Sequence, residues 1–329
     1  MNSIRSEKGI AYSRLATPWQ TADEPLISII IPCYNQAQYL SEAIESSLRQ
    51  DYPKVEVIVV NDGSTDNTAE VAARYPAVRC ITQSNQGLSA ARNAGLNDSR
   101  GSFLVFLDAD DRLLPHALST GYRMLQAHPD CAFVYGNYLC MAADGSPLPP
   151  PIFRTESDVY AGLLKRNFIS MHATVMYQRA VFEAVGSFDP RCRAAEDYEM
   201  YLRIVRQFPI CYHPEPVAEY RHHPESMTKR PALMLSATME VLRRQWKYVR
   251  GNELCRQAYR EGVRICQENY GVRLVNEIRA NVRARREWRQ TVRNLLVLLK
   301  YYPSAFFGHA LRKLYCRIFR IESDFATSV

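Results

Sequence analysis

Three carboxylates follow an apolar segment near the first third of the sequence. Residues 103–107 are all Phe, Leu or Val, and Asp108, Asp110 and Asp111 come directly after them. Clustered acids raise each other's pKa and repel one another, so fold stability gives no reason for them. Mg²⁺ or Mn²⁺ gives one, because these cations take oxygen ligands and usually keep bound phosphates among them. The pattern therefore predicts a divalent-cation site for a phosphate-bearing ligand.

The position of these acids strengthens the prediction. An Asp-x-Asp triplet alone is weak evidence, because about one occurs by chance in a chain of this length. Here the triplet stands at the carboxyl end of a predicted strand, which is where open α/β sheets bind their ligands.

Two further acidic sites are candidates for the same chemistry. Asp62 follows a second predicted strand, and Glu196 and Asp197 stand at the start of a predicted helix. A plain turn would also explain Asp62, and a helix-dipole cap would also explain the other two. Together, however, the acids form a complete set for transfer from a nucleoside diphosphate. One would lie near the base or ribose, one would bind the metal, and one would abstract a proton.

Alternating strand and helix patterns predict the elements that position these acids. Apolar, β-branched runs predict strands over residues 26–32, 55–60, 78–82 and 102–107. Helical patterns fall between them. They cover 38–50, a segment after the second strand that ends at about 74, and 87–97. This order predicts an α/β fold with a doubly wound, mostly parallel sheet and right-handed crossovers. After about residue 130 the pattern loosens, although 197–208 again shows helical periodicity.

Length and charge indicate more than one part. A chain of 329 residues exceeds what one core usually organises, so we expect a full domain plus an appendage. Residues 229–320 contain 21 Lys or Arg and 6 Asp or Glu, a net charge of +15, so the rest carries −8 of the total +7. We therefore predict an N-terminal tail over 1–25, an α/β domain over 26–228 and a basic helical extension over 229–329.

Cysteine usage and hydropathy indicate a cytoplasmic protein. Nine cysteines are scattered without a Cys-x-x-Cys pair, which argues against a zinc site or a disulfide framework. Residues 1–24 are polar and contain no apolar core of a secretory signal. The longest apolar candidate for a membrane span, 295–311, is interrupted by Lys300 and Pro303.

Seven sequence blocks occur in a characteristic order along residues 26–228. They are SIIIPCYN at 28–35, VVNDGSTD at 59–66, NQGLSAARN at 85–93, FLDADD at 106–111, GSFD at 186–189, EDYEMYLR at 196–203 and YRHHPESM at 220–227. With these blocks the chain resembles the family-two glycosyltransferases of A-type fold. That large inverting group moves a sugar from a nucleotide-sugar to an acceptor hydroxyl. The C-terminal hundred residues lie outside the resemblance.

The resemblance implies a donor site, a metal site and a catalytic base. Inversion needs a carboxylate that takes the acceptor proton, and a divalent cation would neutralise the diphosphate leaving group. The residues that match the nucleotide-binding positions are Pro32, Tyr34, Asn35 and Asp62 at the base, Arg92 over the nucleotide, and Asp108 with Ala109 at the ribose. The residues that match the remaining roles are Asp110 for Mg²⁺ or Mn²⁺ and Asp197 for the general base.

Several other positions have both a functional and a structural interpretation. Glu196 would orient Asp197 or the acceptor, whereas Asp111 is more simply a support or a helix cap than a ligand. Arg221 and His223 would contact the pyrophosphate or the metal, or would be an ordinary surface Arg and a hydrogen-bonded His. The remaining candidates are His172 for the acceptor cleft, against a structural role, and Tyr135 and Asn137 for the sugar site.

The partners follow from the same resemblance and from the charge. The donor would be a nucleotide-sugar, with UDP the commonest nucleotide in the family, and the acceptor a glycan or lipid-linked glycan in surface-polysaccharide assembly. The basic extension would contact an anionic membrane surface on the cytoplasmic side, or would only pack on the rest of the chain. No helix-turn-helix, zinc or RNA-recognition motif supports nucleic acid as a partner. The oligomeric state is left open.

Three alternative functions remain to be weighed. A sugar-nucleotide nucleotidylyltransferase would have a Gly-rich, basic phosphate loop after the first strand, where this chain has Pro32-Cys33-Tyr34-Asn35-Gln36. A processive polysaccharide synthase would have membrane spans and a Gln-x-x-Arg-Trp block. This block is absent from the sequence. A catalytically silent nucleotide-sugar-binding scaffold would have no reason to keep all four acids at 62, 108, 110 and 197.

Overall fold

The computed structural model describes residues 24–153 and 157–303, and the chain divides into two compact units. The first unit is Met1–Ser226 and the second is Met227–Val329. Most of the predicted N-terminal tail, residues 1–23, lies outside the described ranges, as do residues 304–329.

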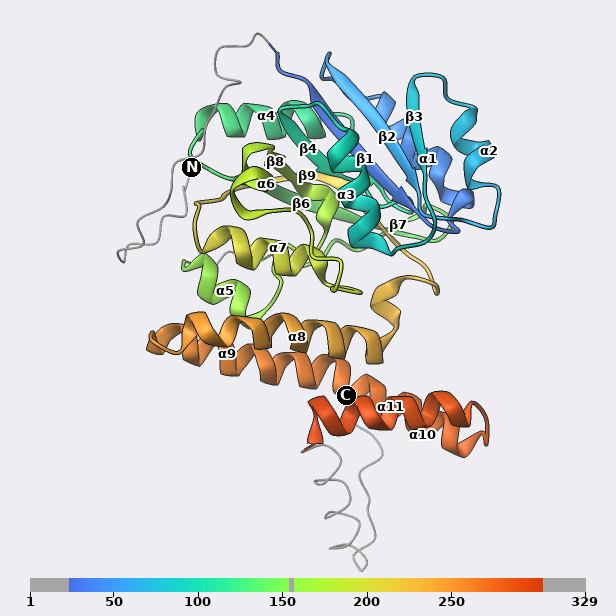
Figure 1. Cartoon of the computed structure of the whole chain (residues 1–329), viewed down its shortest axis with the longest axis vertical. Coiled ribbons are helices and arrows are strands. Elements are labelled where there is room, and N and C mark those ends of the chain that lie inside the picture. The colour runs from blue at the N-terminus through green and yellow to red at the C-terminus, as the bar shows by residue number, and fades with distance from the viewer. Residues whose placement is uncertain (1–23, 154–156, 304–329) are drawn as a thin grey trace, which may run out of the picture. The chain divides into compact units, whose positions relative to one another are not determined.

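The first unit is built on a mixed nine-stranded sheet (Figure 1). Its strand order is β3-β2-β1-β4-β8-β6-β9-β5, with β7 paired to β6. The strands are β1 (Ile27–Cys33), β2 (Val55–Asn61), β3 (Val78–Thr82), β4 (Phe103–Phe106), β5 (Arg112–Leu113), β6 (Phe133–Ala142), β7 (Pro147–Leu148), β8 (Val175–Gln178) and β9 (Cys211–His222). The helices are α1 (Ala37–Leu48), α2 (Thr68–Ala73), α3 (Leu88–Asp98), α4 (Ala117–Ala127), α5 (Val159–Lys165), the 3-10 turn η2 (His172–Thr174), α6 (Ala180–Val185) and α7 (Glu196–Val205).

The predicted doubly wound, mostly parallel sheet is confirmed in strands β3, β2, β1 and β4. These strands run parallel, and Ile30 at the centre of β1 lies between Ile58 of β2 and Phe106 of β4. Every residue of β1 is buried, as expected for a β-branched run covered on both faces. The carboxyl ends of these strands lie at one edge, so the loops that carry Asp62 and Asp108 come together there.

Helices cover both faces of this half of the sheet. Residues 27, 29 and 31 of β1 face a core shared with α1, α2 and α4. On the opposite face α3 approaches the sheet so closely that a Cβ added at Gly95 would lie 2.3 Å from Ile30 Cγ2. Gly95 therefore allows α3 to pack directly on β1 and β2.

Beyond β4 the strand directions change. β8 pairs antiparallel with β4 and β6, whereas β6 and β9 run parallel with a register shift around Asn137. Cys131, before β6, forms a disulfide with Cys211 at the start of β9, with Cα atoms 6.0 Å apart. The argument against a disulfide framework did not anticipate this pair, because 80 residues separate two cysteines that neighbouring strands bring together.

The described part of the second unit, residues 227–303, is helical. It contains η3 (Met227–Lys229), α8 (Pro231–Val249), α9 (Glu253–Cys266), the π-helical turn η4 (Gln267–Gly271), α10 (Val272–Arg283) and α11 (Trp288–Tyr301). Pro231 occupies the first turn of α8, where its missing N–H costs nothing, and the Asn252 side chain accepts the Cys255 N–H to cap α9. Within residues 24–153 and 157–303, no helix is both long and apolar enough to cross a membrane.

Candidate active site

One corner of the candidate site is made by the loops after β1 and β2. Asn35 has a left-handed backbone with φ 52°, and its N–H donates to Ser64 Oγ at 3.1 Å. Asn35 Oδ1 accepts the Thr65 N–H at 2.8 Å, so its side chain ties the two loops together. Tyr34 is exposed beside it, whereas Pro32 is buried within β1. A planar ligand at this corner would meet Tyr34 first.

Asp62 is nearly buried at this edge of the sheet. Its Oδ1 accepts Gln83 Nε2 at 2.7 Å and the Gln86 N–H at 2.9 Å, and its Oδ2 accepts the Gly87 N–H at 2.9 Å. The carboxylate thus shapes the loop that leads into α3. Gly87 has φ 88°, a conformation that glycine adopts without strain. The structure shows Asp62 as more than a plain turn residue, and its contact with a nucleobase stays a prediction.

Arg92 links the strand-end acids to the start of α7. Its guanidinium is buried, donates to Asp108 Oδ1 at 2.7 Å, and also donates to Glu196 Oε1. Burial alone would lower the pKa of Arg92, but the charges of Asp108 and Glu196 raise it. The cation lies 5.7 Å from the centre of the Phe188 ring. Arg92 therefore holds two acids that are far apart in the sequence, and its predicted place over the nucleotide is untested.

Asp110 and His223 form the pair that sequence analysis assigned to a metal. His223 Nε2 lies 2.8 Å from Asp110 Oδ2, and the same oxygen accepts Gln36 Nε2 at 3.1 Å. Burial, and then the charge of Asp108, raises the pKa of Asp110. His223 Nδ1 is buried and has no hydrogen-bond partner among the described residues. Ala109, between the two acids, is fully buried in the core.

Asp111 and Arg221 are support residues of the same loop. Asp111 Oδ1 accepts the Arg221 N–H at 2.9 Å, and burial raises the pKa of Asp111 well above its usual range. The buried Arg221 guanidinium donates to Asp110 O at 2.8 Å, Ala143 O at 2.9 Å and Glu42 Oε2 at 2.6 Å. Each of its three nitrogens thus donates to a group of the protein itself. Arg221 is therefore not the exposed surface residue that was one alternative.

Glu196 and Asp197 begin α7 directly after a strained residue. Ala195 has a left-handed backbone, with φ 56° and ψ 28°, which costs free energy for a residue with a Cβ. Glu196 is buried by Arg92, whereas Asp197 is half-buried and accepts Asn167 Nδ2 at 3.4 Å. Burial, and then the charge of Glu196, raises the pKa of Asp197 to about 7. Strain concentrates at functional sites, so this turn is a candidate for one.

The three remaining candidates lie in or near the aromatic part of the core. His172 is buried, stacks on Phe106 with ring centres 5.2 Å apart, and contacts Tyr177 Oη at 3.0 Å through Nε2. Burial lowers its pKa well below the usual range, so the ring is neutral, and its contacts with Phe106 and Tyr177 favour the structural interpretation. Tyr135 is buried as well. Asn137 Nδ2 donates to Pro214 O at 2.8 Å, so its amide stabilises the register shift between β6 and β9.

Sequence analysis missed two polar contacts of the site. Gln36 directly follows the block that ends at Asn35, yet only the fold shows that its amide reaches Asp110. Asn167 lies in a loop without a motif, and its contact with Asp197 had no signal in the sequence.

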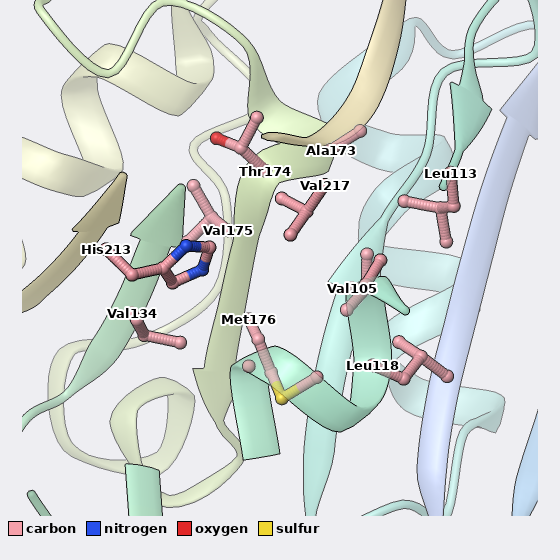
Figure 2. A pocket seen from close by; sticks show the side chains of 12 residues that line it. Val105, Leu113, Leu118, Val134, Ala173, Thr174, Val175, Met176, His213 and Val217 are labelled. Carbon is pink, nitrogen blue, oxygen red and sulfur yellow. The ribbon is translucent and has the colours of Figure 1, made fainter. Parts of the chain in front are cut away.

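A small cavity lined mostly by apolar side chains lies elsewhere in the first unit. Figure 2 shows side chains such as Met176, Leu118 and His213 around a space of about 10 Å³ between α4 and the sheet. This is about the least volume that holds one water molecule, and none of the candidate acids lines it. Burial lowers the pKa of His213 to about 4, so this histidine is neutral at pH 7. The cavity is a packing defect behind the sheet and is not the active site.

Proteins that are similar in sequence are named as glycosyltransferases or as a glycan synthase. The sequence profile of glycosyl transferase family 2 matches residues 28–186. The chain is 33% identical over 205 residues to the Bacillus subtilis glycosyltransferase TuaG, named for teichuronic acid biosynthesis; the match covers 60% of this chain and 79% of TuaG. It is 32% identical over 188 residues to chondroitin synthase of Pasteurella multocida, covering 55% of this chain and 19% of that enzyme.

Two solved structures share the fold. TarS 1–349 of S. aureus, in complex with UDP-GlcNAc, superposes with a TM-score of 0.54 at 18% identity, covering 86% of this chain and 92% of that one. The mannosyltransferase PcManGT of Pyrobaculum calidifontis, in complex with GDP-Man and Mn²⁺, superposes with a TM-score of 0.56 at 16% identity, covering 90% of each chain. With this fold, and with a relative matched over most of its length, the chain belongs to glycosyl transferase family 2 and is a glycosyltransferase.

Proposed function

We propose that the enzyme transfers a sugar from a UDP-sugar, with inversion, to a hydroxyl of a glycan or lipid-linked glycan in surface-polysaccharide assembly. The name of TuaG supports the polysaccharide context, and TarS was solved with UDP-GlcNAc. PcManGT was solved with GDP-Man, so GDP-sugars are the second donor class to test.

One contact carries the proposal. Arg92 joins Asp108, at the end of β4, to Glu196, at the start of α7. Asp197 is the next residue after Glu196, so the predicted base starts the helix that is tied to the strand-end acids. A base must lie within hydrogen-bond reach of the proton that it takes. The two ion pairs of Arg92 hold the start of α7 to the loop after β4, where the donor would bind.

The reaction follows from the residues in these positions. The Asp197 carboxylate accepts the proton of the acceptor hydroxyl while that oxygen attacks the anomeric carbon of the donor. The bond from the anomeric carbon to the diphosphate oxygen breaks, and its electron pair leaves with the nucleoside diphosphate. Because attack comes from the face opposite the leaving group, the anomeric configuration inverts.

The residues present fit a divalent cation. No group of three or more His, Cys, Asp or Glu side chains within 24–153 and 157–303 is arranged to hold a metal alone. Asp110 and His223 offer one oxygen and one nitrogen 2.8 Å apart, and Mn²⁺ and Mg²⁺ complete their shells with phosphate oxygens and water. We propose that these two residues hold the cation. When bound, it would neutralise negative charge that develops on the leaving diphosphate.

The nucleotide contacts belong to the same proposal. Tyr34 and Asn35 would contact the base together with Pro32 and Asp62, Asp108 and Ala109 would lie at the ribose, and Arg92 would support the nucleotide through Asp108. The side chains of Tyr34 and Asn35 are both exposed at this corner, although Asn35 Oδ1 already accepts the Thr65 N–H.

Location and attachment are proposed from charge. We propose a cytoplasmic enzyme whose basic residues after 228 contact the anionic face of the membrane, where a lipid-linked acceptor would lie. The proposed extension of 229–329 falls within the second compact unit, Met227–Val329.

The decisive experiment is a donor screen with a matched pair of variants. The purified protein is incubated with UDP-, GDP- and dTDP-sugars, with Mn²⁺ or with EDTA, and nucleotide release is measured. Asp197→Asn should reduce transfer by at least about 10²-fold while it leaves nucleotide binding intact. Glu70→Gln, which changes an exposed carboxylate on α2, should match the wild type. Binding of a donor without turnover under any condition would instead support the silent scaffold.

A further inference from the structure

Four apolar side chains of helix α11 are exposed. Trp288, Val292, Leu296 and Leu299 are 54%, 54%, 62% and 39% exposed. Their spacing of four, four and three residues places them along one face of the helix. These four residues are called the α11 stripe below. A helix of a globular protein normally turns such a face inward, so the stripe requires an explanation.

The inward face of α11 is partly polar, and two of its polar side chains form hydrogen bonds within the same unit, whereas Thr291 Oγ1 has no partner among the described residues. Thr291, Asn294, Leu298 and Tyr301 are its buried residues. Asn294 Nδ2 donates to Glu277 of α10 at 2.7 Å. Tyr301 Oη donates to Glu240 of α8 at 2.6 Å. These contacts fix the rotation of α11, because turning the stripe inward would expose both hydrogen-bonded side chains to solvent.

Cations run along one side of the stripe. Arg289, Arg293 and Lys300 each follow a stripe residue by one position, so they occupy the adjacent sector of the helix. All three are exposed, and Lys300 pairs with Glu240 at 3.2 Å. Residues 288–303 contain no Asp or Glu. Three more arginines, at 283, 285 and 286, precede the stripe within six residues.

We propose that α11 docks on an anionic lipid surface, lying in the plane of the membrane with its stripe among the acyl chains. The helix has the features of an interfacial helix: an apolar sector, adjacent arginines and an aromatic residue at one end. Arg289 and Arg293 would then pair with lipid phosphates. A second copy of the chain is a poorer occupant, because a self-complementary contact would bring two sets of the same cations together. The inference names the face for the proposed membrane contact and does not depend on the donor or the acid roles.

Vesicle binding of the full chain tests the docking. Binding to phosphatidylcholine vesicles containing an equal part of phosphatidylglycerol is measured at low and at high salt, with pure phosphatidylcholine as reference. The wild type should bind only the anionic vesicles, and more weakly at high salt. Each cation near the surface contributes about fivefold, so the double change Arg289→Gln and Arg293→Gln should weaken binding roughly 25-fold. Leu296→Glu should weaken it about tenfold or more.

Matched variants separate the stripe from general charge and apolarity. Leu254→Glu changes a 48% exposed leucine on α9, and Arg260→Gln changes an exposed arginine on the same helix. Neither should alter vesicle binding by more than about twofold. Soluble donor hydrolysis should be unchanged in Leu296→Glu, so loss of docking is distinguishable from loss of the proposed enzyme activity.

Tryptophan quenching places the helix in the membrane. The chain has tryptophans at 19, 246 and 288, and changing Trp19 and Trp246 to Phe leaves Trp288 as the single probe. Brominated lipids should quench its emission in anionic vesicles. Binding that persists in Leu296→Glu, or Trp288 that is not quenched, would overturn the proposal. A dimer that Leu296→Glu converts to a monomer, without vesicle binding by the wild type, would assign the stripe to a second copy instead.

Discussion

Arg92 Nη2 lies 2.7 Å from Asp108 Oδ1, and the other terminal nitrogen of the same guanidinium contacts Glu196. Both Arg92 and Glu196 are buried, so neither charge has water as an alternative partner. The strand-end loop and the start of α7 are therefore held by one cation.

Removing that cation should destabilise the first unit strongly. Arg92→Met leaves the Glu196 charge buried and uncompensated, a change that typically costs about 3–5 kcal/mol. Urea unfolding measures it, and the double variant with Glu196→Gln should recover part of the loss. Arg49→Met, at an exposed i,i+4 pair with Glu45, should cost under about 1 kcal/mol. Equal effects of Arg92→Met and Arg49→Met would disprove the buried bridge.

The pH dependence of transfer should report Asp197. Its pKa is raised to about 7, so the carboxyl is mostly protonated, and unable to accept a proton, below that pH. The value of kcat/KM should therefore rise with pH through about 7 and level off above it. For stability the sign is opposite, because a raised carboxyl pKa favours the folded state at low pH, and this contribution is lost as pH rises through 7. A kcat/KM profile already flat from pH 5 would contradict the assignment of the base.

The metal requirement should depend on His223. His223→Asn removes the imidazole, so the concentration of Mn²⁺ that gives half-maximal activity should rise about 10- to 100-fold. Titration of Mn²⁺ in the presence of UDP measures the same affinity without turnover. His222→Asn changes the neighbouring half-buried histidine and serves as the control. Unchanged Mn²⁺ dependence in both variants would remove His223 from the metal site.

Close packing of α3 on the sheet should make Gly95 intolerant of a side chain. The added methyl of Gly95→Ala would lie 2.3 Å from Ile30 Cγ2, and overpacking of this kind costs about 1–3 kcal/mol. Gly251 has no atom within 4 Å of an added Cβ, so Gly251→Ala should be nearly neutral. Thermal unfolding compares the two. A stable Gly95→Ala protein would mean that α3 can move away from the sheet.

The parallel half of the fold could be predicted because its signals are local. The apolar runs of β1, β2, β3 and β4 identify buried strands on their own, and the alternation with helices implies parallel crossovers. The strand directions beyond β4 could not be predicted in the same way, because those strands do not alternate regularly with helices and are joined by irregular loops. Pairing of Cys131 with Cys211 depends on that second half, so the sequence held no spacing that indicated it.

The candidate site was predictable as a set of residues and not as a set of contacts. Motifs mark Asp62, Asp108 and Asp197, but they do not show that Arg92 is buried between two acids or that Arg221 is directed at its own chain. The contacts of Arg92 with Glu196 and of Arg221 with Asp110 join residues 104 and 111 positions apart, and only the fold brings them together. Arg92 therefore changed from a predicted nucleotide contact to a structural link whose contact with the nucleotide is still open.

The strand direction changes after β4, and the proposed roles of the first unit are divided between the parts of the chain before and after this point. On the proposed roles, every contact with the nucleobase and the ribose comes from residues before 112. The catalytic base, Asp197, comes from the half after 130. A new acceptor could therefore be accommodated by exchanging loops of the later half, with the parallel strands and their nucleotide pocket left intact. The Arg92 bridge and the proposed metal ligand His223 would both constrain such an exchange, since any replacement must still present a carboxylate to Arg92 and an imidazole to Asp110.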